Sequence, residues 1–121
     1  MLEHARARPG EEVCGLLGAK DGAFTSFHPV ANVAEDRTRR FLMDARGQID
    51  AMRRMREDGE ELLGIFHSHP EGPGEPSAED LAMAAYPGTI YFIAAPEAGA
   101  GTWVLRAFRY DGTGFTGIAV N

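Results

Sequence analysis

The chain has 121 residues, a length that suits a single domain with one hydrophobic core. Hydrophobic residues make up 44% of it, yet no apolar run reaches the roughly 18 residues of a membrane span. The formal net charge of −6 argues against nucleic acid as the main partner. No secretion signal is readable, and the single cysteine, Cys14, cannot form an internal disulfide. These features predict a cytoplasmic protein that neither spans a membrane nor binds nucleic acid.

Hydrophobic patterning predicts two helices and two strands in the first half of the chain. The turn at 20–22 separates the two strands and favours a hairpin. In the longer helix, which follows the polar loop 31–40, Ile49, Met52 and Met55 recur at helical spacing. The expected ranges are a helix over 2–8, strands over 13–19 and 23–30, and a helix over 45–57.

The second half is predicted to contain a strand, a helix and three further strands. A loop rich in Pro and Gly, 70–76, precedes the helix, and Ser77 is its expected N-cap. The expected ranges are a strand over 62–67, a helix over 77–85, and strands over 89–95, 103–110 and 114–120. The pattern predicts one α+β domain over 1–121, with a mostly antiparallel mixed sheet flanked by helices.

Two histidines one residue apart, His67 and His69, stand at the end of the predicted strand over 62–67. Because strand side chains alternate between faces, residues i and i+2 point the same way, and both imidazoles can reach one point. Asp80 lies in the first turn of the next helix, close to the strand end if the loop folds back. Two imidazoles and one carboxylate leave a fourth tetrahedral position open, as in catalytic zinc sites.

Each half of this pattern also has a simpler interpretation. The acidic residues after Ser77, including Asp80, could serve only as a helix cap favoured by the helix dipole. His67 and His69 could be surface histidines at a strand end. The occurrence of both features within 67–80, joined by a short loop, favours the metal site.

The segment 67–70, His-Ser-His-Pro, followed after six residues by Ser77-x-x-Asp80, resembles the metal motif of the JAMM metallopeptidases, the JAB1/MPN/Mov34 family. That family also places a glutamate shortly before a pair such as Cys14-Gly15, which selects Glu12 here. The resemblance implies an MPN/JAMM (cytidine-deaminase-like) domain in which His67, His69 and Asp80 bind Zn²⁺. The compact chain, with a minimal loop between His69 and Ser77, resembles the prokaryotic subgroup.

The chemistry of such a site suggests a role for each remaining group. Zinc lowers the pKa of bound water to about 7, and a nearby carboxylate, Glu12, is the candidate general base. Ser77 can donate its hydroxyl to the developing oxyanion while it accepts from the backbone as a helix cap. Ser68 is expected to point to the opposite strand face and receives no chemical role. Cys14 is interpreted as a buried core residue, not a nucleophile.

The resemblance also implies a substrate, namely the peptide or isopeptide bond after the C-terminal Gly-Gly of a ubiquitin-like or sulfur-carrier protein. Segments 31–41 and 94–101 are the expected rims of the substrate site. Family members usually have a β-strand before the first helix, and this chain starts inside that helix. The sheet edge without that strand leaves a homodimer as an open alternative.

Two other functions remain open at this stage. One is a non-catalytic MPN module that scaffolds partners, although such modules lack ligands that are present here as His67, His69 and Asp80. The other is a zinc amidohydrolase acting on a small molecule, such as a deaminase, although the Cys-x-x-Cys ligands of zinc deaminases are absent.

Overall fold

The computed structural model describes residues 1–97 and 101–120 and contains three α-helices and six β-strands. Among the described residues, no helix is long and apolar enough to cross a membrane. The elements are α1 (Leu2–Ala7), β1 (Cys14–Lys20), β2 (Ala23–Val30), α2 (Ala45–Glu57), β3 (Glu61–Ser68), α3 (Ala78–Met83), β4 (Ile90–Pro96), β5 (Trp103–Tyr110) and β6 (Phe115–Ile118). The predicted α+β class is confirmed, with element ends shifted by one to a few residues.

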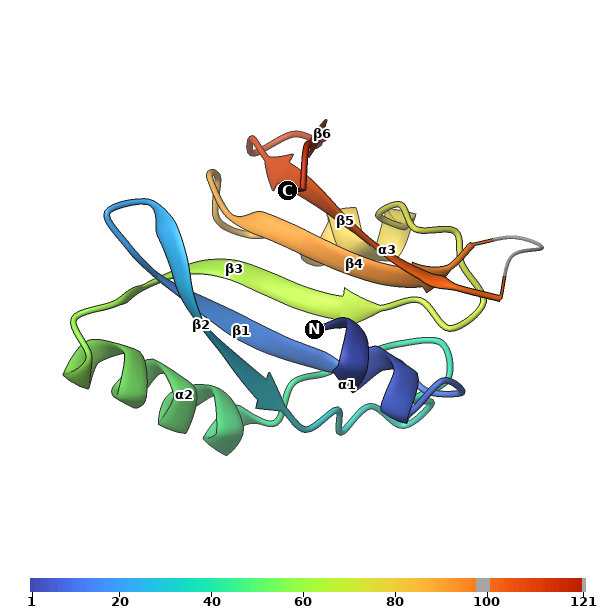
Figure 1. Ribbon diagram of the computed structural model, residues 1–121, viewed down its shortest axis with the longest axis horizontal. Helices are drawn as coiled ribbons and strands as arrows, with labels where there is room; N and C mark the ends of the chain where they lie inside the picture. The colour runs from blue at the N-terminus through green and yellow to red at the C-terminus, as the bar shows by residue number, and fades with distance from the viewer. Residues whose placement is uncertain (98–100, 121) are drawn as a thin grey trace.

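The six strands form one sheet in the order β2-β1-β3-β4-β5-β6 (Figure 1). All neighbours run antiparallel except β3 and β4, which are parallel. Two parallel neighbours need a crossover connection, and α3 lies in the one that joins them. The chain that leaves the carboxyl end of central β3 therefore passes over a sheet face before it returns as β4.

The sheet separates two hydrophobic clusters, because side chains along each strand alternate between its faces. On β3, Phe66 belongs to the cluster that includes Ala5 of α1, whereas Ile65 packs against the cluster that includes Met55 of α2. His67, two residues after Ile65, therefore points to the α2 face. Figure 1 shows α1 and α3 on opposite faces of the sheet.

Helix α2 has the range 45–57 that its apolar spacing predicts, but only some of its apolar side chains are buried. Ala51 and Met55 are its buried residues, while Ile49 is 57% exposed and Met52 is 37% exposed. The helix packs on β1, β2 and β3 through one narrow stripe. Met52 lies beside that stripe and lines a surface groove, so its apolar side chain is available to a partner.

Gly15, the glycine of the Cys14-Gly15 pair, marks a close approach of β1 and β2. A Cβ atom at Gly15 would lie 2.7 Å from the carbonyl oxygen of His28 and 2.5 Å from the Phe27 ring. We expect Gly15→Ala to lower the free energy of unfolding by about 1–3 kcal/mol, because the backbone of β2 must shift. Urea denaturation measures this, with Gly10→Ala as the control, since a Cβ there meets nothing within 4 Å. Equal losses in both variants would contradict the steric explanation.

Candidate metal centre

Three side chains converge at the carboxyl end of β3. The Nε2 atoms of His67 and His69 lie 2.9 Å apart, and Asp80 Oδ2 lies 3.1 Å from the first and 3.2 Å from the second. Donor atoms about 2.0–2.1 Å from a tetrahedral zinc ion are separated by about 3.3 Å. The spacing of these three atoms therefore fits one zinc ion, and the two histidines and Asp80 meet as their sequence spacing predicts.

The two imidazole rings are oriented in different ways. His69 Nδ1 donates a hydrogen bond to the carbonyl oxygen of Pro73 at 2.8 Å, which leaves the Nε2 lone pair facing the centre. His67 is fully buried and stacks on Phe41, with ring centroids 4.5 Å apart. Its Nδ1 has no hydrogen-bond partner within the described part of the chain. Burial lowers the pKa of His67, which favours the neutral ring that metal binding requires.

Asp80 is brought to the centre by the first turn of α3. Ser77 is the N-cap as predicted: its Oγ accepts from the Asp80 amide at 3.0 Å, and its own amide donates to Asp80 Oδ2 at 2.9 Å. Burial tends to raise the pKa of Asp80, but hydrogen bonds from His67 and His69 outweigh it and hold that pKa well below its usual range. The carboxylate thus stays ionised, and the Ser77 hydroxyl proton remains free for a further partner.

Glu12, just before β1, is the second carboxylate of the centre. It is only 7% exposed, and one ligand atom each of Glu12, His67 and His69 lie within 4.8 Å of one another. Burial raises the pKa of Glu12 to about 7, with an opposing contribution from His69. A carboxyl group that titrates near neutrality and lies beside the metal ligands suits a general base.

Ser68 holds the backbone on both sides of Glu12. Its buried Oγ accepts from the Val13 amide at 2.9 Å and donates to the Glu11 carbonyl at 3.4 Å. The alternation argument places Ser68 correctly on the face opposite the histidines, but it misses this positioning role. A fully buried serine in an apolar strand is the signal that sequence analysis could have used, because a buried hydroxyl needs hydrogen-bond partners.

Asn32, which the sequence analysis did not single out, connects Glu12 to the loop that follows β2. Its Nδ2 donates to the carbonyl oxygens of Glu12 at 2.7 Å and Arg40 at 2.9 Å. Its Oδ1 accepts from the amides of Ala34 and Leu42, both at 3.0 Å. One amide side chain therefore fixes the loop that carries Phe41 and anchors it to the candidate base.

We expect Asn32→Ala to lower the free energy of unfolding by about 1–3 kcal/mol, because four backbone groups, two of them part-buried, lose their hydrogen bonds to this side chain. If Glu12 acts as a catalytic base, we also expect turnover to fall, since Glu12 loses an anchor while the metal ligands keep theirs. Denaturation measures the stability, the rate of substrate cleavage measures the turnover, and the zinc content checks that the metal ligands are undisturbed. Thr38→Ala, in the same loop but with exposed hydrogen bonds to Asp36, is the control. Full activity in Asn32→Ala would contradict the positioning role.

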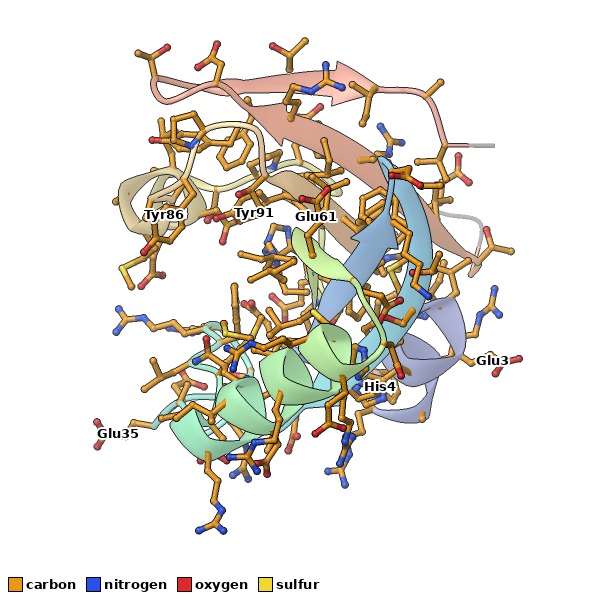
Figure 2. The ribbon with its side chains drawn as sticks, turned by 90° about the vertical axis from the view of Figure 1, so that its left-hand side faces the viewer. Glu3, His4, Glu35, Glu61, Tyr86 and Tyr91 are labelled. Carbon is orange, nitrogen blue, oxygen red and sulfur yellow. The ribbon has the colours of Figure 1, made fainter. Side chains whose placement is uncertain are left out.

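A groove of about 640 Å³ leads to the metal centre. One wall is formed by α2 and the loop after β2, and the other by α3 and the residues that follow it, including Tyr86. In Figure 2, Tyr86 and Tyr91 lie on the opposite side from Glu35, and all three line the groove. Glu12 and Asp80 also line it. Arg40 forms an ion pair of 3.5 Å with Glu79, which joins the two walls.

The two segments predicted as rims of the substrate site, 31–41 and 94–101, differ in whether they line this groove. The segment 31–41 lines the groove through Ala34, Glu35 and residues 39–41 and so borders the candidate site. The described residues of 94–101 do not line it, and residues 98–100 lie outside the described residues.

Comparisons with known proteins show the family to which the chain belongs. A family model described as prokaryotic homologs of the JAB domain matches residues 1–110. The chain is 35% identical over 103 residues to a desampylase of Haloferax volcanii, covering 80% of this chain and 74% of that protein. It is 28% identical over 94 residues to a CysO-cysteine peptidase of Mycobacterium tuberculosis, covering 77% of this chain and 64% of that one.

A solved structure shows the same architecture. The solution structure of a protein from Desulfitobacterium hafniense matches with a TM-score of 0.82 at 37% identity, covering 98% of this chain and 82% of that chain. The match to the family model extends over most of the chain and includes every residue of the candidate centre. The chain therefore belongs to the family of prokaryotic homologs of the JAB domain, as the resemblance drawn from its motif implies.

Proposed function

We propose that this chain is a zinc-dependent peptidase that hydrolyses the peptide or isopeptide bond after the C-terminal Gly-Gly of a ubiquitin-like or sulfur-carrier protein. The observation that carries the proposal is the convergence of His67, His69 and Asp80 beside Glu12 at a groove. The names of two relatives, a desampylase and a CysO-cysteine peptidase, support a protein conjugate as the substrate.

Each residue of the centre has a separate part in hydrolysis. His67, His69 and Asp80 would hold the zinc ion, which supplies a Lewis acid that acidifies water and polarises the scissile carbonyl. Glu12 takes a proton from the attacking water and passes it to the leaving amine, so that a carboxylic acid and an amine result. Ser77 donates its hydroxyl to the oxyanion that develops on the carbonyl oxygen.

The groove suits an extended tail. Apolar side chains of Leu16, Met43, Met52, Ile65 and Tyr91 line it on the way to the centre. A carrier tail that enters along this path would place its last two residues beside the metal ligands. Glycine at those two positions leaves room for the backbone to approach closely.

The test is a small ubiquitin-like carrier that ends in Gly-Gly and is fused to a reporter peptide. We expect the zinc-loaded protein to cut after the second glycine, a chelator to stop the reaction, and added zinc to restore it. Mass spectrometry of the products locates the cut. A zinc-loaded, folded protein that leaves every fusion intact would contradict the proposal and favour a scaffold. Turnover of small amides alone would favour the amidohydrolase alternative.

A further inference from the structure

A second hollow lies on the other side of α3. It has a volume of about 390 Å³ and lies between α3 and the β5–β6 hairpin. Leu81, Phe108 and Phe115 form its apolar walls, and Gly117 of β6 borders it. As far as the structure describes the chain, its lining carries one charged residue, Glu75.

Helix α3 separates this second hollow from the groove. Glu79, Asp80 and Met83 line the groove, whereas Ala78 and Leu81, one helical turn apart, line the hollow. Ser77, the residue that caps the helix, lines both. Both spaces therefore border the start of α3, next to the carboxylate that completes the metal centre.

We propose that the second hollow binds the side chain of the residue that follows Gly-Gly, on the leaving-amine side of the scissile bond, and that it favours an apolar side chain there. This inference rests on the function proposed above. A bond held at Ser77 and Asp80 has an acyl side and an amine side, which extend in opposite directions. The larger groove takes the acyl side, since several residues of a carrier tail must lie there, and the hollow takes the other side.

The chemistry of the hollow sets the preference. Contact with two phenylalanine rings and Leu81 stabilises a bound aliphatic or aromatic side chain. An acidic side chain would lose its hydration against these apolar walls and would be repelled by the carboxylate of Glu75. Differences of this kind in a hydrophobic pocket alter kcat/KM by about 10–200-fold. We therefore expect Gly-Gly-Leu and Gly-Gly-Phe fusions to exceed Gly-Gly-Asp by at least about tenfold.

Gly117 offers a way to fill the hollow without altering the metal centre. A Cβ atom there would lie 3.9 Å from the Phe108 ring, an ordinary contact, so a larger side chain has room to extend into the hollow. We expect Gly117→Leu to lose the preference for Leu and Phe over Ala after Gly-Gly that the parent shows. Gly117→Glu should instead favour Gly-Gly-Lys. Gly114→Leu is the matched control, since a Cβ there meets nothing within 4 Å and Gly114 does not line the hollow.

The experiment measures kcat/KM for the zinc-loaded parent and variants on carrier fusions that differ only in the residue after Gly-Gly. Circular dichroism checks that each variant is folded, and the parent series tests the preference without any variant. Equal cleavage of all fusions by the parent would overturn the hollow's role and leave the peptidase proposal standing. The same conclusion would follow if the Gly117→Leu variant altered the preference for the residue before Gly-Gly. Cleavage of none of the fusions would overturn both proposals.

Discussion

Replacing Glu12 by glutamine is expected to abolish most of the turnover and leave zinc bound. The amide keeps the size of the side chain but cannot take a proton, and loss of a general base costs about 10²–10⁴-fold in rate. Zinc should stay, because His67, His69 and Asp80 keep their geometry. Metal analysis of the purified variant and the rate of cleavage of a Gly-Gly fusion give the two measurements.

The neighbouring acid supplies the control for this variant. Glu11 forms surface ion pairs with Arg8 at 3.7 Å and Arg37 at 3.6 Å. Exposed ion pairs of this kind contribute little to the free energy of folding. Glu11→Gln should therefore keep both zinc and turnover. If Glu12→Gln cleaves as fast as the parent, Glu12 is not the base. If it loses zinc, Glu12 is itself a ligand.

Asp80→Asn is expected to have the largest effect on metal binding. Asparagine keeps an oxygen that can accept from the Ser77 amide, so the cap of α3 survives, but it removes the negative charge from the centre. Loss of an outer partner of a metal ligand costs about 10–100-fold in affinity, so loss of a direct ligand should cost more than about 100-fold. Competition with a chromogenic chelator measures the affinity, and cleavage activity should follow zinc occupancy.

Glu79→Gln is the matched control for Asp80→Asn, because it removes one charge from the same helical turn. Glu79 is exposed and pairs with Arg40, away from the converging nitrogens. Unchanged zinc affinity in Asp80→Asn would point to another ligand set. The group of Glu12, His67 and His69, whose ligand atoms lie within 4.8 Å of one another, would then be the candidate.

The core of the metal centre could be predicted from sequence because short-range rules place it. Strand alternation brings His67 and His69 to one side, and a capping box brings Ser77 and Asp80 to the same end of α3. The choice of Glu12 depended on family resemblance, because a single acid before a strand is common. The structure shows that Glu12 is buried, and this burial raises the pKa of Glu12 to about 7.

The parts that sequence did not predict depend on contacts between distant segments. Asn32 reaches Glu12, and Phe41 stacks on His67, across separations that no strand or helix period encodes. The apolar spacing in α2 includes Ile49 and Met52, yet both are exposed, and Met52 lines the groove. Apolar periodicity identifies a helix but does not distinguish a core face from a binding face.

The four hydrogen bonds of Asn32 also have a consequence for local stability. The loop after β2 belongs to no helix or named strand, so its order depends on hydrogen bonds such as those of the Asn32 amide, the bond from the Glu12 amide to the Arg37 carbonyl and the bond from the Val33 amide to the Leu42 carbonyl. Opening the loop therefore exposes several backbone groups together. In native-state hydrogen exchange, the amide protons of Glu12, Ala34 and Leu42 should exchange as one cooperative unit. We therefore expect the groove wall and the backbone beside the candidate base to unfold together, at a lower free energy than the strands of the central sheet.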